Sequence, residues 1–343
     1  MEAILEEPAE LQTSSTDPVM PAVKVSKLVR RYGSVAAVDG IDLQVAKGEV
    51  YGFLGPNGAG KSTLIRMLCT LLHPTSGQAV VAGFDVVTNP QDVRLRIGVA
   101  LQEAALDERQ TGRELLKLQG RLYGLRPAEI RTRLDDVLDL VNIGSSIDRR
   151  VGTYSGGMKR RLDLAAALVH NPEILFLDEP TTGLDPASRE AVWSEVRRLN
   201  HQLGMTIFLT TQYLEEADEL ADRVGFIAKG HLVAEGAPET LKRSIGQDLI
   251  VADLQVDESG AVVGDLASAL DELDSLGLIG TISTEHSHLV LPTSDGPAAL
   301  SPVALALGRA RLQVKSLTLR TPTLDDVFRE LTGSAIESKD ESE

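Results

Sequence analysis

The sequence predicts an α/β fold followed by a smaller α+β domain, and three observations support this prediction. Up to about residue 245, short apolar runs typical of strands buried on both faces alternate with helical periodicity. A glycine-rich segment at residues 55–63 joins one of these runs to a helix. After residue 245 the pattern becomes β-α-β-β-α-β, the order of the ferredoxin-like motif. A length of 343 residues suits two domains.

The composition is that of a globular chain with acidic ends. The formal net charge is −16, and residues 1–21 and 334–343 are acidic segments that we expect to be disordered. This balance argues against nucleic acid as a partner, because phosphate backbones require a basic face. No long uncharged apolar stretch predicts a transmembrane helix, and the single Cys69 suits a reducing compartment.

In the first part of the chain, strands and helices are expected to alternate. Apolar runs at residues 51–54, 174–177 and 206–209 predict buried strands. Helical periodicity over residues 112–141 and 192–203 predicts helices between them. Such alternation produces crossover connections and therefore a mostly parallel sheet.

The second part is expected to contain four strands and two main helices. The strands are expected at residues 249–256, 278–284, 287–291 and 312–319, and the helices at residues 266–273 and 297–308, the latter interrupted near its start by Pro302. A last helix over residues 323–331, with Thr323 as its N-cap, is expected to close this domain.

The strongest chemical signal is a phosphate-binding loop. The pattern Gly-x4-Gly-Lys-Ser/Thr lies between a predicted strand and a predicted helix, where its mechanism requires it. Glycines let successive N–H groups face one anion, and the helix start adds its positive end. Lys61 supplies a charge for the outer phosphates, and the Ser62 hydroxyl can ligate Mg²⁺. The predicted nucleotide-binding residues of this loop are Gly55, Pro56, Asn57, Gly58, Ala59, Gly60, Lys61, Ser62 and Thr63.

A pair of carboxylates follows the buried run at residues 174–177. Asp178 and Glu179 emerge at the C-terminal end of this predicted strand, where parallel sheets place their ligands. Asp178 is expected to hold Mg²⁺, directly or through water. Glu179 is placed to accept a proton from an attacking water molecule.

A third signal is a second helix start that can bind an anion. Ser155 is expected to cap a helix, and Gly156 and Gly157 expose backbone N–H groups at its positive end. A simple capping role explains such a turn equally well when it is taken alone. One chain would then contain two anion-binding helix starts.

These three motifs, in this order, resemble the nucleotide-binding subunit of an ABC transporter over roughly residues 22–240. The resemblance implies that Tyr32 stacks on adenine, that Gln102 contacts Mg²⁺ and the attacking water, and that Asp185 lies in the loop that crosses to a partner subunit. It implies a nucleotide-binding domain at residues 22–246, with a helical subdomain at about residues 103–165. The change of pattern after residue 245 predicts an accessory domain at residues 247–333.

The same resemblance implies ligands and partners. In that family two subunits bind two nucleotides head to tail, each between one subunit's phosphate loop and the other's Ser-Gly-Gly helix. ATP, Mg²⁺ and a second copy of this chain are therefore expected. A separate membrane-spanning permease subunit is expected too, which would place this chain peripherally at the cytoplasmic face of the membrane.

One departure from the family pattern narrows the resemblance. Gln212 follows Thr210 and Thr211 where the family has a histidine that reaches the γ-phosphate, and a glutamine amide can donate a hydrogen bond there but carries no charge. Together with the segment at residues 321–328, this glutamine resembles the daunorubicin-resistance branch of drug-export ATPases.

Several functions remain to be compared at this point. The leading hypothesis is an ATPase subunit that powers drug or antibiotic export, and export of lipid or cell-envelope components is the runner-up. A soluble ABC ATPase acting on ribosomes or chromosomes is disfavoured by the single motif set and the absence of heptads. A nucleotide-binding pseudo-enzyme is suggested by Gln212 and opposed by Lys61, Asp178 and Glu179. The accessory domain could regulate, dimerise or dock a partner.

Overall fold

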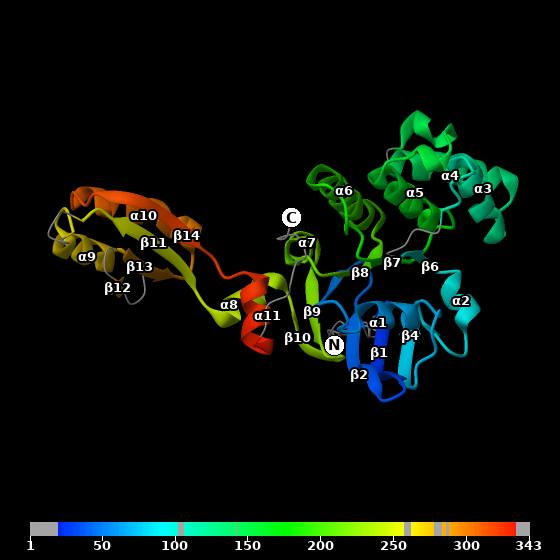
Figure 1. The fold of residues 1–343 in the computed structure, drawn as a ribbon, viewed down its shortest axis with the longest axis horizontal. Coiled ribbons are helices and arrows are strands. Elements are labelled where there is room, and N and C mark those ends of the chain that lie inside the picture. The colour runs from blue at the N-terminus through cyan, green and yellow to red at the C-terminus, as the bar shows by residue number, and fades with distance from the viewer. Residues whose placement is uncertain are drawn as a thin grey trace, which may run out of the picture.

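The computed structural model describes residues 20–101, 106–141, 143–256, 262–277, 283–285 and 288–333. Three sheets and their helices make up this part of the chain, and the small third sheet lies at the opposite end from the helices α3 and α4 (Figure 1). The two acidic end segments fall outside the described residues, apart from Met20 and Pro21.

A six-stranded sheet forms the centre of the first part, with strand order β10-β9-β3-β8-β7-β6. The five strands from β9 to β6 are parallel, and only β10 pairs in the antiparallel sense. Every residue of β3, β7 and β8 is buried, which explains their continuous apolar sequences. The strands are β3 (Val50–Leu54), β6 (Ile97–Ala100), β7 (Ile174–Asp178), β8 (Thr206–Thr211), β9 (Arg223–Ala228) and β10 (His231–Gly236).

An antiparallel sheet shares a core with this central sheet. Its strand order is β2-β1-β4-β5. Helix α1 (Lys61–Leu68) contributes Leu64 and Ile65 to the cluster of buried side chains that the two sheets share. The strands are β1 (Val23–Tyr32), β2 (Val35–Val45), β4 (Ser76–Val81) and β5 (Phe84–Asp85), and the short helix α2 (Pro90–Arg94) follows them.

Three helices pack together above the central six-stranded sheet (Figure 1): α3 (Gly112–Leu122), α4 (Pro127–Val141) and α5 (Gly156–Leu168). Helix α3 starts at a capping box in which Thr111 and Glu114 satisfy each other's backbone N–H groups. Helix α6 (Pro186–Leu203) packs against α4 and α5, and the short helix α7 (Leu214–Leu220) follows β8.

The C-terminal strands and helices occur in the predicted β-α-β-β-α-β order. They form an antiparallel sheet with strand order β12-β13-β11-β14, and helices α9 and α10 share its apolar core. Helix α10 runs continuously through Pro302, so the expected interruption is wrong. The strands are β11 (Asp248–Leu254), β12 (Ser283–Glu285), β13 (His288–Thr293) and β14 (Val314–Arg320), and the helices are α9 (Leu266–Ser275) and α10 (Gly296–Arg309). The fold class predicted from the sequence is confirmed.

The last helix, α11 (Leu324–Thr332), packs on the first part of the chain and not on the small sheet (Figure 1). Its Phe328 ring lies 5.6 Å from the ring of Phe226 in β9, and α11 also contacts α8 (Pro238–Ile245). The expectation that this helix closes the C-terminal domain is therefore wrong. The strongly amphipathic helix needs an apolar partner, and β9 and α7 provide it.

Among the residues that the structure describes, no helix has the length and apolar content to cross a membrane.

Candidate active site

The loop between β3 and α1 forms the floor of a pocket of about 260 Å³. It follows a fully buried strand, and glycine is required at two of its positions. A Cβ on Gly55 would lie 2.3 Å from the carbonyl oxygen of Ile227, and one on Gly60, whose φ is +116°, would lie 2.2 Å from that of Ala37. The loop is therefore held between β9 and β2, and its backbone can curl only with these glycines.

No side chain caps the start of α1 at Gly60, so its first N–H groups face the pocket without a built-in acceptor. This arrangement fits a phosphate group, which such helix starts attract through N–H donors and the helix dipole. The pocket is lined by Ala37, Pro56, Asn57, Gly58, Gly60, Lys61, Ser62, Thr63 and Glu179.

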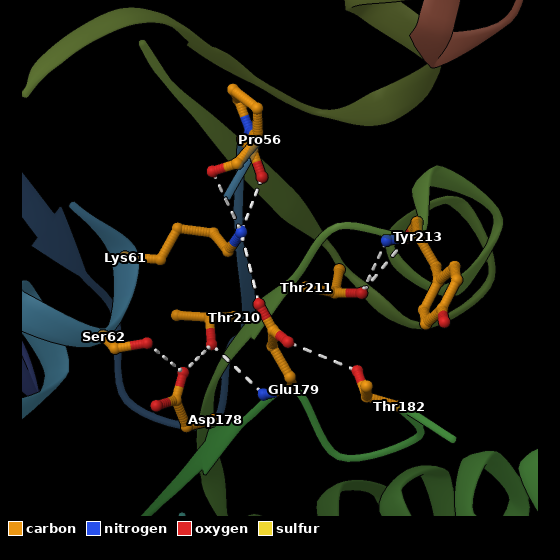
Figure 2. A network of polar contacts seen from close by, with 10 residues as sticks. Pro56, Lys61, Ser62, Asp178, Glu179, Thr182, Thr210, Thr211 and Tyr213 are labelled. Atoms are coloured by element: carbon orange, nitrogen blue, oxygen red, sulfur yellow. Dashed lines mark hydrogen bonds and ion pairs between the residues drawn. The ribbon is translucent and has the colours of Figure 1, made fainter. Parts of the chain in front are cut away.

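Lys61 is buried at this site, with 4% of its side chain exposed. Its Nζ donates to the carbonyl oxygens of Gly55, at 2.6 Å, and Pro56, at 3.3 Å, and lies 3.3 Å from Oε1 of Glu179 (Figure 2). Burial lowers the pKa of Lys61, and the neighbouring Glu179 and Asp178 partly oppose this shift. A cation with this little access to water has a strong affinity for added anionic oxygens.

Asp178 ends β7 beside the hydroxyl groups of two neighbouring elements (Figure 2). Its Oδ1 accepts hydrogen bonds from Oγ of Ser62, at 3.2 Å, and from Oγ1 of Thr210, at 2.5 Å. Thr210 is the register partner of Asp178 in β8. The parallel pairing of β7 and β8 therefore fixes the carboxylate beside the start of α1.

Glu179 has a backbone conformation that is unusual for a side chain of its size. Its φ is +49°, in the left-handed region, where a residue other than glycine is strained. Its N–H donates to the carbonyl oxygen of Thr210 at 3.0 Å, and its Oε2 accepts from Oγ1 of Thr182 at 3.3 Å. These contacts hold the carboxylate toward Lys61, as Figure 2 shows.

The start of α5 lies apart from this pocket. Ser155 and Gly156 are exposed, and Oγ of Ser155 accepts the N–H of Met158 at 3.3 Å. The helix start is thus capped, as expected from the sequence, but neither Ser155, Gly156 nor Gly157 lines the pocket. The two predicted anion sites of this chain are separate within one subunit.

The remaining predicted site residues are placed as follows. Asp185 caps α6 by accepting from N and Oγ of Ser188, and these hydrogen bonds lower its pKa. Tyr32 ends β1 with 49% of its surface exposed and its ring under the guanidinium of Arg30.

Gln212 follows β8 and is buried, and its Oε1 has no hydrogen-bond partner among the described residues. Gln102 lies outside the described residues.

Sequence reasoning assigned no site role to Thr182 and named Thr210 only as part of a strand end. The contacts of Thr210 depend on the register of β7 against β8, and no local pattern in the sequence encodes that register. Thr182 lies three residues after Glu179, a spacing that could have suggested its contact with the carboxylate.

Mg²⁺ fits the oxygen donors of this site. The ion prefers oxygen ligands, retains water and shares substrate phosphates, so one carboxylate and one hydroxyl suffice on the protein side. Asp178 and Ser62 provide these two groups at one end of the phosphate loop. Among the described residues, no group of three or more histidine, cysteine or acidic side chains forms an all-protein metal site.

Comparisons with known proteins agree with this geometry. The family model described as ABC transporter matches residues 38–182. A daunorubicin resistance ATP-binding protein of Streptomyces coeruleorubidus is 48% identical over 91% of this chain and 96% of the relative. The chain belongs to the ABC transporter ATP-binding proteins, in the daunorubicin-resistance branch. A daunorubicin/doxorubicin resistance ATP-binding protein of Streptomyces peucetius is 46% identical over 94% of this chain and 96% of the relative.

Solved structures support the same fold. The cbiO1 subunit of the cbiONQ ABC transporter complex from Clostridium perfringens superposes with a TM-score of 0.60 and 27% identity, covering 66% of this chain and 94% of that subunit. The predicted family, fold, and role as the ATPase subunit of an ABC exporter are confirmed. This subunit binds nucleotide and couples ATP hydrolysis to transport.

Proposed function

We propose that the pocket above the phosphate loop is the hydrolytic site for ATP with Mg²⁺, with Glu179 as general base. The observation that carries this proposal is that Lys61, Ser62 and Glu179 line one pocket, with Asp178 hydrogen-bonded to Ser62. Bound Mg²⁺ would supply positive charge to the phosphate oxygens, with Asp178 and Ser62 as its protein ligands.

The Lys61–Glu179 ion pair suggests how binding prepares the base. Phosphate oxygens compete with the Glu179 carboxylate and with the Gly55 carbonyl for the Lys61 ammonium group. When Lys61 turns to phosphate, Glu179 loses its ion-pair partner and can accept a proton from water. The hydrogen bonds from Thr182 to its carboxylate and from its own N–H to Thr210 keep it in place.

We also propose a head-to-tail pair of copies, in which Ser155 and the two following N–H groups contact the nucleotide of the other copy. Their exposure and their distance from the pocket of their own chain support this arrangement. Tyr32, which is exposed at the end of β1, is proposed to stack on adenine. Asp185 is proposed to act in the loop that crosses to the partner subunit. Gln102 is proposed to contact the attacking water.

The proposed cargo is a drug or antibiotic, exported through a separate membrane-spanning permease at the cytoplasmic face of the membrane. Relatives named for daunorubicin or doxorubicin resistance support this cargo. A relative named for Nod factor export also matches, so drugs do not exhaust the cargo classes among the relatives. Export of a lipid or cell-envelope component by this subunit stays the alternative proposal.

The decisive experiment on the site is Glu179→Gln. The amide keeps the size of the side chain and removes the proton acceptor, so kcat should fall by roughly 10²–10⁴-fold. Steady-state phosphate release measures kcat, and titration with a fluorescent ATP analogue measures binding, which should stay within twofold. Thr88→Ala, in an exposed turn far from the pocket, is the control. Turnover of Glu179→Gln within twofold of the parent would contradict the assignment.

The cargo is tested in cells that produce this subunit with its permease. Drug resistance that is lost with Glu179→Gln would support the drug class. Unchanged drug sensitivity, with cell-envelope material retained in the Glu179→Gln strain, would favour the alternative.

A further inference from the structure

The Arg160 side chain links three segments of the chain, namely its own helix α5 and the backbone at Leu101 and Pro180. Its Nε donates to the carbonyl oxygen of Pro180 at 2.9 Å, and its Nη1 donates to that of Leu101 at 2.8 Å. Nη1 also lies 3.2 Å from Oδ2 of Asp163, one turn along α5. Only 11% of the Arg160 side chain and 14% of the Asp163 side chain are exposed.

The three segments are the ones that carry the proposed chemistry. Pro180 directly follows Glu179, and Leu101 directly precedes Gln102. Arg160 itself lies in the first turns of α5, the helix that begins after Ser155. One guanidinium therefore connects the helix proposed to face the other copy's nucleotide with the backbone beside the proposed base of its own site.

Only arginine suits this arrangement. Its planar fork directs several N–H donors at fixed angles, whereas a lysine ammonium is a single point charge on a flexible stem. Burial lowers the pKa of Arg160 and raises that of Asp163 to about 6, and each charge opposes the shift of the other. A buried charge is retained at such a position only with partners, and the two carbonyl oxygens and Asp163 provide them.

We propose that Arg160 is a positioning residue that transmits the docking of α5 to Glu179, and so couples the two nucleotide sites of the dimer. The strained backbone of Glu179 supports this role, because a residue with φ of +49° keeps its conformation only where its neighbours enforce it. The hydrogen bond to Pro180 acts one peptide away from that strained residue. This inference rests on the proposed function of Glu179 and of the α5 start.

The test compares Arg160→Lys with a matched control, Arg133→Lys, at the far end of α5. Arg133 in α4 makes the same kind of contacts, with two carbonyl oxygens at the far end of α5, Leu168 and Val169, and with Asp136 three residues on. Arg160→Lys should lower kcat about ten- to hundredfold, because small displacements of a catalytic group have effects of this size. Arg133→Lys should change kcat less than twofold.

Further readouts separate positioning from stability. In Arg160→Lys the Kd for a fluorescent ATP analogue should stay within twofold, because Arg160 does not line the pocket. The Hill coefficient of the ATP dependence should fall toward one. Tm should fall by the same amount in both variants. A kcat for Arg160→Lys equal to that of Arg133→Lys, or an unchanged Hill coefficient, would overturn the proposal.

A second variant applies if Arg160→Lys does not fold. Asp163→Asn keeps the guanidinium and its bonds to both carbonyl oxygens but removes the charge that orients it. It should lower kcat about threefold to tenfold with unchanged Kd, and an unchanged kcat overturns the proposal. Failure of the proposed function can be told apart from failure of this inference. It would appear as normal turnover of the Glu179→Gln variant, whatever the Arg160 variants do.

Discussion

The starts of α1 and α5 are both glycine-rich helix N-termini, yet the structure builds them differently. The start of α1 is uncapped and lies in a pocket whose walls carry Lys61 and Glu179. The start of α5 is capped by Ser155 and exposed, and a Cβ on Gly156 would meet only Leu184, at 3.8 Å. One helix start is surrounded by the proposed catalytic groups of its own chain, and the other faces outward without them.

This difference shows that a helix N-terminus alone does not make a hydrolytic site. Anion affinity arises from N–H groups and the dipole in both helices, but the groups proposed for acid–base chemistry and metal binding lie beside α1. The start of α5 therefore suits a contact to a nucleotide that another chain already holds. The first two of the following predictions separate the two roles, and the others test neighbouring groups.

The largest expected effect in this comparison is that of Gly156→Asp. The exposed position has room for the side chain, so Tm should change little, but the new carboxylate would face the phosphates held by the other copy. Like charges in such an interface cost several kcal/mol, so turnover should fall by about 10²-fold or more. Binding of a fluorescent ATP analogue should be unchanged. Gly156→Ala is the control for bulk, and equal losses in both variants would point to shape and not to charge.

Lys61→Ala is expected to act on binding itself. It removes a charged donor worth about 1.5–3 kcal/mol, so the Kd for the ATP analogue should rise roughly ten- to hundredfold. The effect should occur in the isolated subunit, because the pocket is built from one chain. Equilibrium titration measures it. An unchanged Kd would show that Lys61 serves only the buried pair with Glu179.

Substitutions at Gln212 should have a smaller effect on turnover. A neutral donor contributes about half as much as a charged one, so Gln212→Ala should lower phosphate release about five- to tenfold, and Gln212→His should be tolerated or faster. Histidine has a reach similar to that of the buried Gln212 side chain that it replaces. Turnover of Gln212→Ala equal to that of the parent would mean that this residue does not contact phosphate.

The last prediction concerns folding stability and not turnover. Glu195 of α6 is buried, and burial raises its pKa to about 7 against the opposing charges of Arg161 and Arg198. Because the folded protein binds this proton more tightly than the unfolded chain, its contribution to stability is present at low pH and is lost as the pH rises from about 4.5 to 7.

Glu195→Gln should therefore raise the free energy of unfolding by about 1–3 kcal/mol at pH 8 and by less at pH 5. Thermal unfolding at both pH values measures the difference as a few degrees in Tm. Glu190→Gln, at an exposed position of the same helix, is the control. An equal gain at both pH values would show that ionisation of Glu195 is not the cause.

The features that were predictable from the sequence depend on residues close together in the chain. The phosphate loop, the buried strands, the caps at Ser155 and Thr323 and the β-α-β-β-α-β order were all predictable, since periodicity and turn chemistry act within a few residues. The contacts between these segments follow from the three-dimensional fold and have no local signal in the sequence. The register of β7 against β8 places Thr210 on Asp178, and the crossing of three segments places Arg160 on Leu101 and Pro180. Helix α11 was predicted as a helix but assigned to the wrong core, because its apolar face is local whereas its partner Phe226 is about a hundred residues away.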